Sequence, residues 1–69
     1  MPDLRQHIVF TREEVVEICE GNDAAWDDLH SMSYYRENLV TIAGYRDLEE
    51  ALRATLPESQ KGLTVLMKP

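Results

Sequence analysis

Apolar residues recur along the chain in two spacings, which predict short strands and amphipathic helices. Residues 7–10, His-Ile-Val-Phe, form a β-branched and aromatic run that is typical of a strand. Residues 63–67, Leu-Thr-Val-Leu-Met, have the same character and lie between Gly62 and Pro69, so they predict a terminal strand. Between these two runs the apolar spacing is mainly that of a helix.

The first helix is predicted over residues 12–20. Thr11 and Glu14 have the T-x-x-E spacing of a capping box, in which each side chain bonds the backbone N–H of the other residue. Because a helix turns about 100° per residue, the apolar side chains share one face. They are Val15, Val16, Ile18 and Cys19. Gly21 follows at the position where glycine commonly ends a helix.

A second helix is predicted to extend from a cap at Asn22 or Asp23 to about Met32. Its apolar side chains fall within one arc and comprise Ala25, Trp26, Leu29 and Met32. The opposite side carries Asp23, Asp27, Asp28 and Ser31. The helix is therefore expected to bury one side and to expose a row of aspartates.

Residues 33–44 allow two interpretations. The β-branched segment of residues 39–43 stops at Gly44, which favours a strand, whereas a helix over residues 34–42 remains open. Farther along, Asp47 and Glu50 match a capping box with Asp as the cap. The helix that this box would begin has an apolar stripe of Leu48, Ala51, Leu52, Thr55 and Leu56.

The same third helix contains a favourable pair of opposite charges and a stop signal. Glu49 and Arg53 are four residues apart, so their side chains meet on the helix surface. Pro57 ends the helix because the residue before a proline is pushed out of the α region. Residues 59–62 then predict a loop before the terminal strand.

The resulting order is β-α-α-β-α-β, which predicts an α+β fold. Helices packed on one face of a short three-stranded sheet are the simplest way to bury these apolar stripes. The 69 residues have room for a single globular domain, residues 1–69, with a small core. A homodimer is compatible with so short a chain, because association would add stability. The pattern does not determine the order of the strands.

The net charge of −6 is concentrated in one quarter of the chain. Residues 13–28 contain seven acidic residues and no Lys or Arg, whereas the remainder contains six acidic and seven basic residues. The seven are Glu13, Glu14, Glu17, Glu20, Asp23, Asp27 and Asp28. An excess of negative charge argues against nucleic acid or an anionic membrane as a direct ligand.

Candidate catalytic and metal-binding residues are few. Cys19 falls on an apolar face among glutamates, which disfavours a thiolate, so it is expected to be a core residue. His30 follows Asp27 at i+3, but two His and one Cys do not make a diagnostic metal site. The glycines are isolated and form no phosphate-binding loop. No enzymatic activity, cofactor or metal is therefore expected.

Helix-turn-helix recognition of DNA is one alternative. The first two predicted helices with the turn at residues 20–23 match that motif in outline, and FTREEVVEI resembles the opening of excisionase-like and MerR-like regulators. The resemblance implies a recognition helix that carries Asp23, Asp27 and Asp28 towards the phosphates. DNA readers use Lys and Arg at such positions, so the charge has the wrong sign.

The charge is better explained by a partner protein with a basic surface. Glu13, Glu17 and Glu20 span about 10 Å of helix at about 1.5 Å per residue, a charge spacing comparable to that of the phosphates along a DNA strand. The expected partner is nucleic-acid-binding machinery, inhibited by nucleic-acid mimicry. In size and charge the chain is similar to anti-CRISPR and anti-restriction proteins of phages. The expected partner-binding residues are Glu13, Glu17, Glu20, Asp23, Asp27 and Asp28, with Trp26 and Tyr35.

The cellular location is expected to be the cytoplasm. The single cysteine suits a reducing compartment, and the first residues lack the features of a signal peptide. No apolar run approaches the length of a membrane span, about 20 residues. A small regulator with a helix-turn-helix core, and a self-associating structural subunit, remain as alternative functions.

Overall fold

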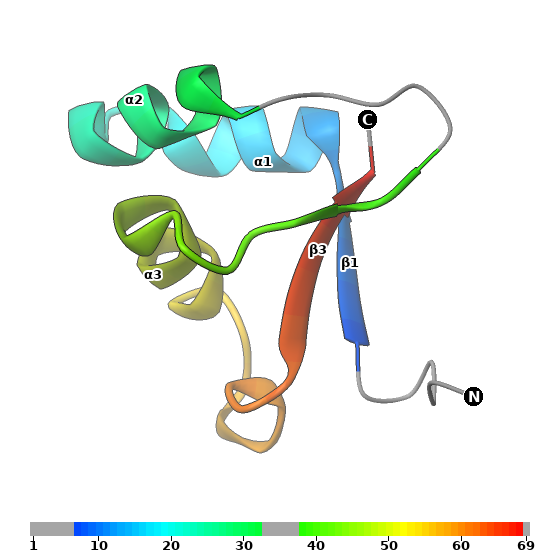
Figure 1. Ribbon diagram of the computed structural model, residues 1–69. Coiled ribbons are helices and arrows are strands. Elements are labelled where there is room, and N and C mark those ends of the chain that lie inside the picture. Colours follow the sequence, from blue (N-terminus) through cyan, green and yellow to red (C-terminus); the bar gives the residue numbers. More distant parts are fainter. Residues whose placement is uncertain (1–6, 33–37, 69) are drawn as a thin grey trace.

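The computed structural model describes residues 7–32 and 38–68. The described chain forms the predicted α+β order, with one additional short 3-10 helix between the last helix and the last strand (Figure 1). The elements are β1 (His7–Thr11), α1 (Arg12–Cys19), α2 (Asp23–Ser31), β2 (Val40–Thr41), α3 (Arg46–Arg53), η2 (Glu58–Gln60) and β3 (Thr64–Lys68).

The sheet has the order β1-β3-β2, which the sequence pattern did not determine. The terminal strand β3 lies in the centre, parallel to β1 and antiparallel to β2. Phe10 of β1 and Val40 of β2 both lie beside Met67 of β3. Because side chains alternate along a strand, these three residues share the face that is turned towards the helices.

The strand interpretation of residues 39–43 is confirmed, although the strand is short. Val40 and Thr41 pair with β3, and the N–H of Ile42 also donates to the carbonyl of Val65 at 3.1 Å. The alternative helix over residues 34–42 is excluded at residues 40 and 41, and its first four residues lie outside the described chain. Ile42 is fully buried, so this segment contributes to the core despite its length.

The three helices lie on the same side of the sheet (Figure 1). α1 and α3 contact β3, whereas α2 packs mainly on α3 and also on α1. The shared core takes buried residues from β1, from the three helices and from β3, together with Met32 and Ile42, which directly follow α2 and β2. Its buried residues are Phe10, Val15, Cys19, Ala25, Leu29, Met32, Ile42, Leu48, Leu52, Val65 and Met67.

The beginning of α1 is the predicted capping box. Thr11 Oγ1 accepts from the N–H of Glu14 at 3.2 Å, and Glu14 Oε1 accepts from the N–H of Thr11 at 3.1 Å. The hydrogen bonds from the Thr11 backbone and hydroxyl hold the pKa of Glu14 below its ordinary value, because they stabilise the charged carboxylate. The box therefore fixes where the strand ends and the helix begins.

The link between α1 and α2 is a type II turn over residues 19–22. Asn22 N–H donates to the Cys19 carbonyl at 3.0 Å, and Gly21 at the third position has φ of 81°. A type II turn requires a positive φ there, which favours glycine. Asn22 Oδ1 then accepts from the N–H of Ala25 at 3.1 Å, so the predicted Asn cap of α2 is confirmed.

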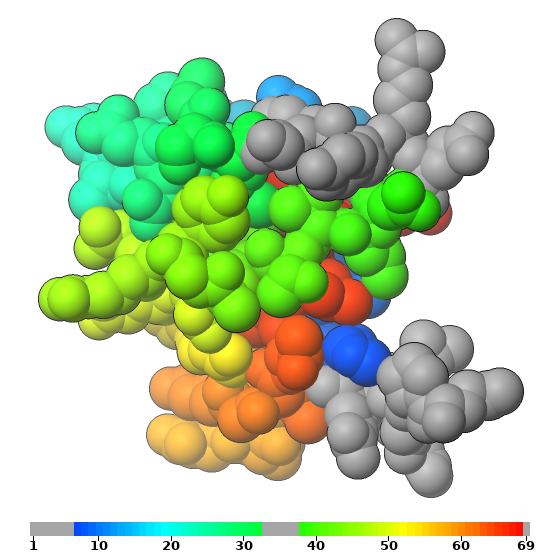
Figure 2. All heavy atoms as spheres, viewed as in Figure 1, coloured from blue at the N-terminus to red at the C-terminus, as the bar shows by residue number. Residues whose placement is uncertain are grey.

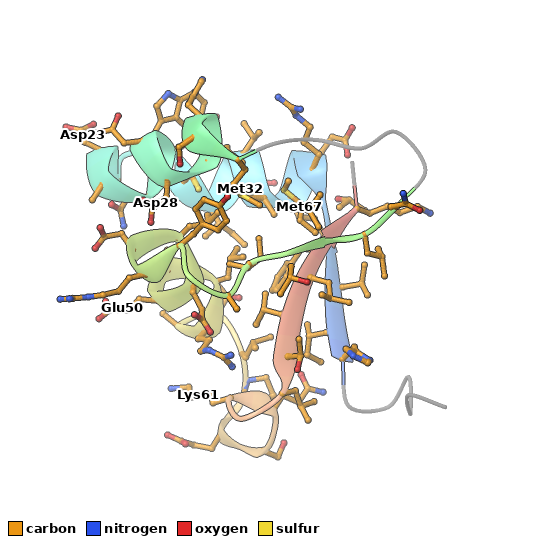
Figure 3. All side chains as sticks on the ribbon, in the orientation of Figure 1. Asp23, Asp28, Met32, Glu50, Lys61 and Met67 are labelled. Atoms are coloured by element: carbon orange, nitrogen blue, oxygen red, sulfur yellow. The ribbon has the colours of Figure 1, made fainter. Side chains whose placement is uncertain are left out.

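The predicted cap of α3 is wrong. The helix begins at Arg46, so Asp47 lies inside the first turn instead of before it, and Tyr45 at the N-cap makes no side-chain hydrogen bond. Instead, Asp28 of α2 reaches across: its Oδ2 accepts from the N–H of Asp47 at 3.0 Å and of Leu48 at 3.1 Å. Figure 3 shows Asp28 on the side of α2 that faces α3. A tertiary contact has replaced the local cap.

The other end of α3 is tied down by Arg53. Its guanidinium forms the predicted pair with Glu49, with Nη2 and Oε2 at 2.7 Å, and Nη1 donates to the carbonyl of Leu63 at 2.8 Å and to that of Lys61. The helix ends at Arg53, so Thr55 is exposed and does not belong to the apolar stripe. Arg53 thereby connects the helix to the segment that leads into β3.

Removal of the Asp28 carboxylate should destabilise the domain. We expect Asp28→Ala to lower the free energy of unfolding by about 1–2 kcal/mol, the usual cost of losing a helix cap. Asp28→Asn keeps an oxygen acceptor and should retain most of the stability. Asp27→Ala changes an exposed neighbour and serves as the matched control. Equal losses for Asp28→Ala and Asp27→Ala in urea unfolding would contradict the capping role.

Removal of the Glu14 charge should change how the free energy of unfolding depends on pH in the acidic range. The folded pKa of Glu14 is lowered, so its contribution is present above the unfolded pKa and is lost as pH falls through the folded pKa. We expect Glu14→Gln to remove part of this pH dependence below about pH 4.3, the ordinary Glu pKa. Glu17→Gln makes the same change in net charge without a cap. If both variants unfold with the same pH dependence, the capping box does not set the pKa of Glu14.

Candidate functional site

One row of carboxylates follows the exposed side of α1. Glu13, Glu17 and Glu20 are all exposed, and at about 100° per residue they fall within about 60° of arc, opposite the buried Val15 and Cys19. Together with Arg12 and Val16, these glutamates line a shallow open groove along the helix. The solvent-exposed side of α1 therefore carries a row of three carboxylates.

A second row lies on the exposed side of α2. Asp23 and Asp27 are one turn apart and both exposed, and Figure 3 shows Asp23 at the end of α2 that is far from the sheet. Trp26 lies beside them with 38% of its surface exposed. The predicted apolar arc of this helix included Trp26, and the structure places this residue at the surface.

His30 is engaged by Trp26 and not by Asp27. Its ring centroid lies 4.9 Å from that of the indole at an angle of 52°, and its Nδ1 lies 3.0 Å from the Trp26 carbonyl oxygen. A carbonyl oxygen can only accept, so this nitrogen carries the proton. Within the described residues no three His, Cys, Asp or Glu side chains are grouped to hold a metal ion.

The two rows meet at a hollow beside the α1–α2 turn. Its lining residues are Cys19, Glu20, Gly21, Asp23 and Trp26. Glu20 also lines the groove along α1, so the hollow and the groove adjoin at this residue. We call the exposed carboxylates on the two helices the acidic surface: Glu13, Glu17, Glu20, Asp23 and Asp27.

Within the described residues, the carboxylates of the acidic surface form no ion pair with a base. In the part of the chain that the structure describes, the side chains of these five residues make no ion pair or hydrogen bond. Glu13 and Glu17, and likewise Asp23 and Asp27, are like-charge i,i+4 pairs, each of which costs a few tenths of a kcal/mol, roughly 0.2–0.5. The surface thus carries a small repulsive energy that a positive partner would relieve.

Two of the seven acids in residues 13–28 have structural roles. Glu14 closes the capping box of α1, and the half-buried Asp28 caps α3, so we do not include Asp28 in the acidic surface. Tyr35, the other aromatic residue expected at the partner-binding site, lies outside the described residues. Binding of a partner by the residues that the sequence analysis named for this role stays a prediction.

Cys19 is the buried residue among those that line the hollow. The side chain is 1% exposed, which confirms the predicted core position. Burial raises the pKa of the thiol, and the negative charge of Asp28 raises it further. A neutral, buried thiol is a poor nucleophile, so the chemistry that the hollow offers comes from its carboxylates and its indole.

Sequence reasoning found the acids but missed the hollow. The signal was present: Asp23 and Trp26 are three residues apart on one helix face, and Gly21 leaves the adjoining turn without a side chain.

In the described ranges, no helix has the length and apolar character needed to cross a membrane. Comparison with known protein families, with curated proteins and with solved structures gives no match to this chain.

Proposed function

We propose that the protein is a non-enzymatic binding protein that docks its acidic surface on a basic surface of a partner protein. The observation that carries the proposal is the row of exposed carboxylates on two adjacent helices, none of them paired within the described chain. Complementary charge speeds encounter and selects the partner. The basic surface would bring opposite charges to these carboxylates.

The partner is proposed to be nucleic-acid-binding machinery in the cytoplasm. Glu13 and Glu20 are seven residues apart, and a helix rises about 1.5 Å per residue, so three carboxylates span about 10 Å. Phosphates along one DNA strand are about 3.4 Å apart, which gives a comparable charge per length. A basic groove shaped for phosphates could therefore accept these helices, and the protein would inhibit its partner by displacing nucleic acid, as anti-CRISPR and anti-restriction proteins do.

A helix-turn-helix regulator is the main alternative. The tight turn between α1 and α2 favours it, because Gly21 and the Asn22 cap join two short helices directly. The exposed side of α2 weighs against it, because Asp23 and Asp27 would face the phosphates. A self-associating subunit is favoured by Val9 on the sheet face away from the helices, which is 47% exposed.

Charge reversal on the acidic surface should weaken partner binding selectively. We expect Glu17→Lys with Asp27→Lys to reduce affinity roughly 10- to 100-fold, since each replaces an attraction by a repulsion. The matched control is Glu50→Lys with Glu58→Lys, which changes net charge equally on α3 and η2. Figures 1 and 2 show η2, in orange, at the end of the molecule away from α2, in green. The control should bind almost normally.

The measurement is capture from host lysate with stepped salt, followed by a mobility shift with the captured protein and its nucleic acid. The wild-type protein should release nucleic acid from the partner, and the surface variant should fail to do so. Equal weakening by both double variants would refute a specific acidic surface. A tight, salt-sensitive shift of DNA by the protein alone would support the regulator, and sedimentation as a dimer with no captured partner would support the self-associating subunit.

A further inference from the structure

The hollow beside the α1–α2 turn combines features that the rest of the acidic surface lacks. Glu20 and Asp23 bring two carboxylates to it, and Trp26 supplies an aromatic wall. Gly21 contributes only backbone, and a Cβ placed there would meet no atom within 4 Å. The space beside Gly21 is therefore open.

The indole is held in place from outside the hollow. His30 packs against Trp26 and donates to its carbonyl, yet His30 does not line the hollow. A surface tryptophan normally samples several rotamers, and contact with a neighbouring ring limits that freedom. Preorganisation of this kind lowers the entropic cost of binding something against the indole.

We infer that the hollow receives an arginine side chain of the basic partner. A guanidinium is planar, so its face can stack on the indole of Trp26 while its edge donates to carboxylates. Glu20 and Asp23 are the carboxylates in reach of such an edge, and charge-assisted hydrogen bonds to them fix its direction. Because a basic partner must be present, this role deepens the proposed function and depends on it.

Other occupants fit the hollow less well. The hollow is open and has a volume of about 280 Å³, close to the lower end of the range of about 300–1,000 Å³ for small-molecule sites, and a single side chain fits such a space. A calcium ion takes at least about six oxygen ligands, and the hollow offers two carboxylates. A nucleic-acid base would stack on the indole, but its phosphate would meet the same two carboxylates. An arginine satisfies both the aromatic and the acidic lining.

The single tryptophan of the chain gives a direct test, because all indole fluorescence comes from Trp26. The probe is a short peptide with blocked ends and one arginine, titrated into the whole protein. We expect a saturable change in fluorescence with a millimolar dissociation constant. The same peptide with citrulline, which keeps the shape and loses the charge, should bind at least about tenfold more weakly. A lysine peptide should fall between them, because an ammonium cannot stack.

Variants locate the binding. Glu20→Gln and Asp23→Asn should each weaken binding of the arginine peptide several-fold, whereas the matched neutralisations Glu50→Gln and Glu58→Gln, at exposed positions outside the acidic surface, should change it little. Equal responses to the arginine and citrulline peptides, or equal effects of all four variants, would overturn the assignment. No fluorescence change with the arginine peptide would also overturn it.

The outcomes separate this role from the proposed function. If Glu17→Lys with Asp27→Lys abolishes partner binding while the arginine peptide leaves Trp26 unaffected, the proposed function stands and the arginine site fails. If the arginine peptide binds in the hollow but the double reversal leaves partner binding unchanged, the docking proposal fails. Trp26→Ala then provides the link, because a partner that inserts an arginine should lose roughly tenfold in affinity or more for this variant.

Discussion

The carboxylate of Asp28 joins α2 to the beginning of α3. α3 begins without a cap of its own, and a helix N-terminus leaves its first N–H groups without partners. Asp28 reaches from α2 and accepts from two of them, one of which belongs to Leu48, a fully buried core residue. The same contact therefore satisfies the backbone of α3 and fixes α2 against it. In a chain with so small a core, one such contact is a large share of the total stability.

The orientation of α2 determines which acids are left at the surface. With Asp28 turned towards α3, and Ala25 and Leu29 in the core, the opposite side of the helix must carry Asp23, Trp26 and Asp27 outward. The acids of α1 divide in the same way. Glu14 closes the capping box of α1, whereas Glu13, Glu17 and Glu20 are exposed to solvent. Residues of one type, close together in the sequence, thus serve folding at two positions and remain available for binding at the others.

The features that the sequence predicted are those decided by near neighbours. The capping box of Thr11 and Glu14, the Asn22 cap and the glycine turn each involve residues at most three apart, and all three are confirmed. The core positions of Cys19 and Leu29 followed from helical spacing in the same way. Failures arose where distant residues compete. Asp47 has the spacing of a local cap, but Asp28, nineteen residues earlier, takes that role. The strand order was hidden for the same reason, because it depends on pairing between the two ends of the chain.

The division of the acids between folding and binding is the central claim, and one scan tests it directly. Each of the seven carboxylates from Glu13 to Asp28 is replaced by alanine in turn, and the free energy of unfolding and the affinity for the proposed basic partner are measured for every variant. Losses of stability should be concentrated at Glu14 and Asp28, and losses of affinity at the five residues of the acidic surface. If both losses fall on the same residues, or if affinity depends only on how many charges remain, the acids are not divided in this way.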